Sequence, residues 1–179
     1  MEENDKNDSI RETIKFAILV IAIIVPFRLF IAQPYIVEGS SMIPTFKNSD
    51  YLIVEQLSPL FNSIERGEVI IMKYPKDPSK YFIKRIIGLP LETIVIEGGK
   101  VSIKNSATTT SLNEPYITFN KNENFSTTLK QGEYFVMGDN RAASSDSRSW
   151  GPLPEKNIVG RPLLRLLPIN NMAVLPGGS

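Results

Sequence analysis

One strongly apolar stretch, Ile14 to Ala32, constrains the fold more than any other part of the 179-residue chain. Its uninterrupted apolar part, Phe16 to Phe27, is shorter than the roughly 20 residues that a membrane-spanning helix needs. The whole stretch is long enough if Lys15 and Arg28 extend their side chains to the two interfaces. We therefore expect a transmembrane signal-anchor helix over residues 14–32.

Two other assignments of this stretch are less favourable. A cleaved signal peptide needs small residues at both positions of an A-x-A site, but Phe30 lies two residues before Ala32. A buried core helix needs an amphipathic pattern, whereas this stretch is apolar on every face.

The distribution of basic residues predicts the orientation of the anchor. No Lys or Arg lies between Arg28 and Lys47, whereas three precede the uninterrupted apolar part: Lys6, Arg11 and Lys15. The positive-inside rule then predicts a cytoplasmic N-terminal tail over residues 1–13 and a main domain on the extracytoplasmic face.

Beyond the anchor the helical period disappears, and short apolar runs alternate with Gly and Pro turns. Gly98-Gly99 has the form of a two-residue hairpin turn, and Pro162 implies an edge strand or a bulge. This pattern predicts one compact, mainly β domain over residues 33–168, built as a barrel or sandwich. The expected strands are Tyr51–Val54, Val69–Tyr74, Lys80–Ile87, Thr93–Glu97, Lys100–Lys104, Tyr134–Met137 and Ile158–Leu167.

Three segments lack a clear pattern. Residues 105–128 are rich in Asn, Ser and Thr without periodicity, so we expect an inserted, partly mobile excursion. Residues 169–179 are expected to form a loose C-terminal tail. The apolar loop Leu57 to Phe61 either fills the core or rests on a lipid surface.

The chain contains no cysteine and no histidine, which excludes several kinds of chemistry. Disulfides, a thiol nucleophile, a Cys/His zinc site and a Ser-His-Asp triad are all impossible. A serine nucleophile would need Lys, Asp, Glu or Tyr as its base. The net charge of +1 gives no electrostatic footprint for nucleic acid.

The segment Val37 to Phe46 is suited to presenting a serine from a rigid turn. Gly39 permits a sharp turn or close approach, and Pro44 restricts the backbone three residues after Ser41. An ordinary Ser/Gly/Pro loop explains the same residues.

Lys84 is the second candidate. Alternation along its strand puts Lys84 on one face with Phe82, and Arg85 on the other with Ile83, so one of the two basic residues must point at an apolar face. A desolvated lysine has a lowered pKa, and its neutral amine can take a proton from a serine. A solvated strand lysine is the alternative.

The third candidate is the polar segment Gly138 to Gly151. It can be a plain loop, or a carboxylate pair or metal site using Asp139 and Asp146. It can also be a supporting shell, meaning a set of residues that holds the catalytic groups in place. In a supporting shell, Asp146 would pair with Arg141 or Arg148, and Ser144 would orient the amine.

Taken together, four segments resemble, in order, the motifs of type I signal peptidases, which are membrane-anchored Ser/Lys endopeptidases. The resemblance covers Arg28 to about Arg165. The segments are Gly39-Ser40-Ser41-Met42-Ile43-Pro44-Thr45, Arg66-Gly67-Glu68-Val69-Ile70, Lys84-Arg85-Ile86-Ile87-Gly88-Leu89-Pro90, and Gly138-Asp139-Asn140-Arg141 through Ser144 and Asp146 to Arg148.

The resemblance implies a role for each matching residue. Ser41, just before the Met, would be the nucleophile and Lys84 the general base. Ser144 would hydrogen-bond the lysine, Asp146 with Arg148 would support the site, and no metal or cofactor would be needed. Val37 and Ile83 would line shallow substrate pockets.

This sequence departs from the family pattern in two places that matter for the site. Gly39 stands where some members have an oxyanion-hole serine, so the hole would use the Ser41 N–H and a further donor such as Ser40 or a water. Leu91 stands where the family usually has a Gly after the Gly88-Leu89-Pro90 segment, which suggests a turn that differs from the family's turn at this place.

The implied protein is a monomeric, single-pass plasma-membrane serine endopeptidase. It would remove signal peptides from exported preproteins after small residues, with signal peptides and the lipid bilayer as partners and no nucleic acid. A narrow-substrate Ser/Lys peptidase of conjugation or organelle type is an alternative. A non-catalytic, membrane-tethered β module that binds extended peptides is another, with Gly39 and Leu91 marking decay of the site.

Overall fold

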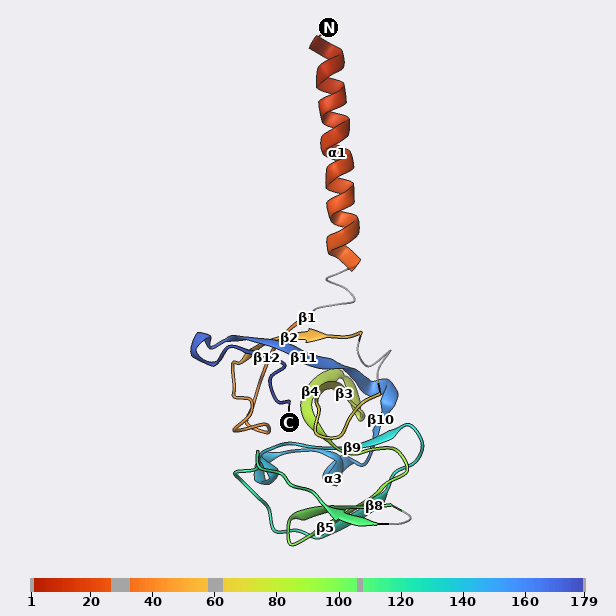
Figure 1. Cartoon of the computed structure of the whole chain (residues 1–179), viewed down its shortest axis with the longest axis vertical. Coiled ribbons are helices and arrows are strands. Elements are labelled where there is room, and N and C mark those ends of the chain that lie inside the picture. Colours follow the sequence, from red (N-terminus) through yellow and green to blue (C-terminus); the bar gives the residue numbers. More distant parts are fainter. Residues whose placement is uncertain (1, 27–32, 58–62, 106–107, 179) are drawn as a thin grey trace.

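The computed structural model describes residues 2–26, 33–57, 63–105 and 108–178. One long helix precedes a domain made of two antiparallel sheets (Figure 1). The main elements are α1 (Glu2–Pro26), β1 (Gln33–Ile36), β2 (Tyr51–Glu55), β3 (Val69–Tyr74), β4 (Asp77–Gly88), β5 (Thr93–Glu97), β6 (Lys100–Lys104), β7 (Thr109–Ser111), β8 (Phe125–Thr128), β9 (Glu133–Met137), α3 (Ser147–Trp150), β10 (Leu153–Pro154), β11 (Ile158–Leu167) and β12 (Ala173–Val174). Short 3₁₀ turns are η2 (Arg141–Ala143), η3 (Glu155–Asn157) and η4 (Ile169–Asn171).

The large sheet has eight strands in the order β1-β2-β11-β3-β4-β9-β10, with β12 paired to β11. The small sheet has four, in the order β7-β6-β5-β8. In Figure 1, β3 and β4 lie between β1, β2 and β11 on one side and β5 and β8 on the other. The mainly β prediction is confirmed, including the hairpin at Gly98-Gly99 and a bulge in β11 beside Pro162.

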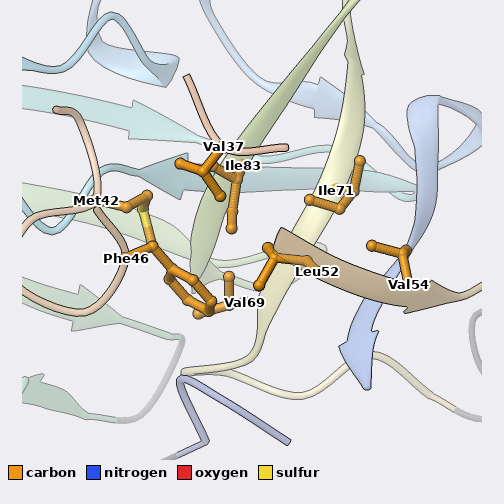
Figure 2. Packing of buried hydrophobic residues seen from close by; sticks show 8 residues of the cluster. All are labelled: Val37, Met42, Phe46, Leu52, Val54, Val69, Ile71 and Ile83. Atoms are coloured by element: carbon orange, nitrogen blue, oxygen red, sulfur yellow. The ribbon is translucent and has the colours of Figure 1, made fainter. Parts of the chain in front are cut away.

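The core beside β4 fixes the segment that carries Ser41. Met42 and Phe46 are 1% and 0% exposed, and they join residues of β2, β3 and β4 in one apolar cluster (Figure 2). Full burial of such a side chain stabilises a fold by about 1.5–3 kcal/mol. Met42 therefore anchors the backbone immediately after Ser41. The cluster consists of Val37, Met42, Phe46, Leu52, Val54, Val69, Ile71 and Ile83.

Helix α1 begins earlier than the sequence predicted. Residues 2–13 were expected to form a tail before the helix, but they are helical, since no Gly or Pro interrupts the chain before Pro26. Its described apolar side chains, such as Phe16 and Ile21, are exposed. No helix in the described ranges is both long and apolar enough to cross a membrane. Residues 27–32 of the expected anchor lie outside the described residues, and the spanning helix remains a prediction.

Two of the segments without a clear pattern are more ordered than expected. The excursion over residues 105–128 contributes β7 and β8, which pair with β6 and β5 at the two edges of the small sheet. The C-terminal tail is not loose, because β12 pairs with β11 and the Gly177 carbonyl accepts a hydrogen bond from Arg85 at 2.7 Å. Of the loop Leu57 to Phe61, all but Leu57 lies outside the described residues.

Candidate active site

Ser41 lies in a tight turn between β1 and β2. Gly39 opens this turn with φ of +89°, a conformation that L side chains rarely adopt, and its N–H donates to Asn48 Oδ1 at 2.9 Å. A Cβ at Gly39 would meet no atom within 4 Å, so the backbone angle rather than space favours glycine. The turn then closes with a hydrogen bond of 2.9 Å from the Phe46 N–H to the Met42 carbonyl.

Lys84 lies on β4 with its amine against the turn that carries Ser41, residues 39–46, here called the nucleophile turn after the role predicted for Ser41. Its Nζ is 2.8 Å from Ser41 Oγ and 2.9 Å from the Ile83 carbonyl oxygen. Lys84 is only 3% exposed, and its Nζ lies 5.3 Å from the centre of the Phe82 ring, as the predicted shared face requires. The structure thus brings together the two residues predicted to form the dyad.

Burial lowers the pKa of Lys84 from 10.5 to about 8, because the ammonium form loses its hydration. The negative charges of Asp146 and Asp139 act in the opposite direction and keep the pKa from falling further. Lowering the pKa increases the fraction of neutral amine near neutral pH, and the neutral amine is the form that accepts a proton.

Arg148 holds Asp146 behind the dyad. Its guanidinium binds the carboxylate with two contacts of 2.8 Å, and Asp146 is completely buried. Oδ2 of Asp146, one of the two oxygens bound by Arg148, also accepts a hydrogen bond from the Gly138 N–H at 3.1 Å. Of the two arginines that the sequence left open for Asp146, the structure selects Arg148.

The expected hydrogen bond from Ser144 to Lys84 is not formed. Ser144 Oγ is buried and has no hydrogen-bond partner among the described residues. The hydroxyl packs against Gly138, where an added Cβ would lie 2.3 Å from it. The loop therefore approaches the site closely, but this hydroxyl does not orient the amine in this structure.

The alternation along β4 required at least one of Lys84 and Arg85 to point at an apolar face, and in the structure both are buried. Arg85 is 2% exposed and binds Asp139 through Nε at 2.9 Å and Nη2 at 2.7 Å. The end of β4 lies between β3 and β9 in a sheet covered on both faces. Asp139 and Asp146 are each bound to a different arginine, so they form a supporting shell rather than the alternative carboxylate pair.

Three functional neighbours from the excursion were missed from the sequence. The Glu114 carboxylate pairs with Arg141, Glu123 pairs with Arg148, and the Arg85 guanidinium lies 4.0 Å from the centre of the Tyr116 ring. The polar segment after Gly138 carries two Arg and two Asp, so its composition gave no signal that further acidic partners would come from elsewhere.

A cavity of about 140 Å³ opens beside the dyad. Val37 and Ile83, the predicted pocket residues, both line it, and Figure 2 shows them side by side. Its walls come from the end of β1, the nucleophile turn and β2, β3 and β4. The lining residues are Tyr35, Ile36, Val37, Glu38, Ser41, Leu52, Ile71, Tyr81, Phe82, Ile83 and Lys84.

Leu91 does not break the turn after β4. Its φ of +70° lies in the left-handed region that glycine favours, and its side chain is exposed. The turn is held by the Glu92 carboxylate, which accepts from the Leu89 N–H at 2.8 Å and pairs with Arg66. Leu91 thus adopts a backbone conformation that a glycine at this position would favour.

Comparison with known proteins identifies the family. Residues 10–167 match the signal peptidase family, peptidase S26. The chain is 36% identical over 180 residues to signal peptidase I of Leptolyngbya laminosa, covering 95% of this chain and 86% of that protein. It is 33% identical over 166 residues to signal peptidase I U of Bacillus subtilis, covering 87% and 86%. A crystal structure of a signal peptidase I from Enterococcus faecalis is 29% identical, covers 56% of this chain and 97% of that one, and gives a TM-score of 0.48. The chain thus belongs to the signal peptidase family, peptidase S26, and is a serine endopeptidase of the signal peptidase I type.

Proposed function

We propose that this protein removes signal peptides from exported preproteins by cutting after small residues, with Ser41 as nucleophile and Lys84 as general base. One observation carries the assignment of the dyad: Ser41 Oγ lies 2.8 Å from the amine of a buried lysine, beside a small cavity. The chain has no histidine that could serve as the base instead.

The reaction follows from this geometry. Neutral Lys84 takes the Ser41 hydroxyl proton as Oγ attacks the scissile carbonyl carbon, and the resulting ammonium returns that proton to the leaving amine. An acyl-enzyme remains on Ser41. Lys84, neutral again, takes a proton from a water as it attacks the ester carbonyl. The Lys84 ammonium then returns this proton to Ser41 Oγ as the ester bond breaks, which releases the acid product and restores both residues.

The substrate is proposed to bind as an extended strand between the segment that leads to Ser41 and the strand that carries Lys84. The exposed edge of β1 and the outer part of β4 line the cavity from the two sides. Val37 and Ile83 then form the wall of the pocket that admits Ala and excludes larger side chains. An N-terminal anchor would keep this site at the outer face of the plasma membrane, where cleavage sites emerge.

Replacing Ile83 by alanine is expected to widen the pocket and relax the requirement for a small residue at the cleavage site. Discrimination by a hydrophobic pocket is worth about 10–200-fold per methylene. Relative to Ala, kcat/KM for a substrate with Val at the cleaved position should therefore rise on the order of tenfold or more. Ile94→Ala, a buried change in the small sheet, is the matched control. Unaltered selectivity in folded Ile83→Ala would remove Ile83 from the pocket.

The pH dependence of the reaction tests the base. The pKa of Lys84 is about 8, so kcat/KM should fall as pH drops below this value and the amine becomes protonated. A serine-reactive acylating probe should label Ser41 with the same midpoint. A profile that is flat from mildly acidic to alkaline pH would contradict a lysine base. An unlabelled Ser41 at every pH would favour a module that only binds peptides.

A further inference from the structure

Asn140 makes two hydrogen bonds to the backbone of the nucleophile turn, from a segment about a hundred residues away in the chain. Its N–H donates to the Ser41 carbonyl oxygen at 3.0 Å, and its side-chain Nδ2 donates to the Ser40 carbonyl oxygen at 3.2 Å. Asn140 is 8% exposed. One buried residue therefore holds the carbonyls of both peptides that flank the nucleophile.

The orientation of the Asn140 amide is determined by its partners. Its Oδ1 accepts from the Ala143 N–H at 3.2 Å, which leaves Nδ2 to donate to Ser40. Exchanging the two amide atoms would set oxygen against oxygen and donor against donor. Asparagine is the residue that can cap η2 and donate to the nucleophile turn at the same time.

Holding the Ser40 carbonyl also orients the Ser41 N–H. The two groups belong to one peptide unit, which is planar and, when trans, directs its C=O and N–H in opposite directions. The Ser41 N–H therefore points away from Asn140, and it has no hydrogen-bond partner among the described residues. An unpaired N–H on the nucleophile itself is suited to stabilising a developing oxyanion.

The neighbouring glycine shows how closely this segment approaches Ser41. A Cβ at Gly138 would lie 2.3 Å from the Ser41 carbonyl oxygen. The segment in turn is fixed from behind, because the Gly138 carbonyl accepts from Arg141 Nε at 3.0 Å and the Gly138 N–H donates to Asp146. The support for Asn140 is thus rigid.

We propose that Asn140 is a positioning residue for the oxyanion hole: by gripping the Ser40 carbonyl, its side chain aims the Ser41 N–H at the substrate oxyanion. This inference rests on the proposed function of Ser41 as the nucleophile. It assigns Asn140 no contact with the substrate and no part in proton transfer. Its effect is confined to the step in which negative charge develops on the substrate oxygen.

Two variants of the full-length enzyme test the proposal. Asn140→Asp keeps the acceptor for the Ala143 N–H and removes only the donor to Ser40, whereas Asn140→Ala removes both without adding charge. Asn157→Asp is a matched control, because Asn157 is also 8% exposed and also donates Nδ2 to a backbone carbonyl, that of Lys73 at 3.1 Å. The control loses an equivalent hydrogen bond at the end of β3.

Cleavage kinetics and inhibitor affinity are then measured together. Loss of one oxyanion donor costs ~10²–10³-fold in kcat, and a misaligned donor should cost on the order of tenfold or more. The KM of both Asn140 variants should stay unchanged, as should the pH midpoint of Asn140→Ala. A peptide aldehyde, which forms a tetrahedral adduct with Ser41, should bind at least tenfold more weakly to the variants. A carboxamide of the same peptide forms no tetrahedral adduct, so the Asn140 variants and the wild type should bind it with equal affinity.

Three results would overturn the positioning role of Asn140. Equal losses for aldehyde and carboxamide, or equal losses in Asn157→Asp, would show a general structural role and overturn it. Unchanged kcat in folded Asn140→Ala would overturn it as well. If wild type binds the aldehyde no better than the carboxamide, the proposed nucleophile itself fails, and this inference fails with it. Should Asn140→Asp not fold, the comparison is made with Asn140→Ala.

Discussion

Replacing Ser41 by alanine or Lys84 by methionine is expected to abolish detectable cleavage of a preprotein with an A-x-A site. Each change removes one partner of the 2.8 Å contact between Ser41 Oγ and Lys84 Nζ. General acid–base catalysis alone contributes ~10²–10⁴-fold, and groups that act as a unit lose more when either is removed. The measurement is kcat/KM for detergent-purified full-length variants, with thermal unfolding recorded to show that each is folded.

Two further variants separate loss of the base from loss of charge or of structure. Lys84→Arg keeps a positive charge and hydrogen-bond donors, but a guanidinium stays protonated in proteins and cannot accept the serine proton, so this variant should be as inactive as Lys84→Met. The double variant of Ser41→Ala and Lys84→Met should be no slower than either single variant. Substantial cleavage by Lys84→Met would show that another group is the base.

The strands that the sequence predicted are those whose side chains contact the core. Val69–Tyr74 and Ile158–Leu167 carry continuous or alternating apolar residues, and both have the predicted bounds. By contrast, β7 is the exposed tripeptide Thr109–Ser111, and β12 is only Ala173–Val174. Such strands are held through backbone hydrogen bonds to a neighbour, which leave no periodic signal in the side chains.

The dyad could be predicted because its members differ so clearly from their surroundings. A lysine among apolar strand residues and a serine beside Gly39 are local features. The partners of the supporting shell are not, because they depend on which distant segments meet. Arg141 is followed closely by Asp146, yet it pairs with Glu114 of the small-sheet excursion, while Asp146 pairs with Arg148. Sequence proximity is a poor guide to pairing where a compact loop places neighbouring side chains in different directions.

Removing the Asp139 carboxylate is expected to cause a large loss of stability, because it leaves its buried partner Arg85 without a counter-charge. The ion pair of Arg85 with Asp139 is almost completely buried, at 2% and 0% side-chain exposure. Breaking such a pair on one side typically costs about 3–5 kcal/mol, because it leaves a buried charge without compensation. Asp139→Ala should therefore lower the free energy of unfolding by about this amount, as measured by urea denaturation.

The exposed pair of Lys80 with Asp77 is the matched control, at 64% and 40% side-chain exposure. Asp77→Ala should change the free energy of unfolding very little, because solvent screens exposed ion pairs. If the two variants lose equal stability, the buried pair is not a structural support. Replacing Arg85 and Asp139 together by apolar residues should recover part of the loss, since no unpaired charge then remains.

Besides stabilising the fold through its ion pair with Arg85, Asp139 affects the proton affinity of Lys84. Its negative charge is one of the two that raise the pKa of Lys84 against the effect of burial. Asp139→Asn, which keeps the shape of the side chain but not its charge, should therefore shift the midpoint of the pH–activity profile to lower pH. A shift to higher pH would mean that the amine has become solvated, and that the variant has opened the site rather than altered its electrostatics. The pair next to Lys84 would then act by excluding water from the dyad, and the stability loss and the pH shift would have one common cause.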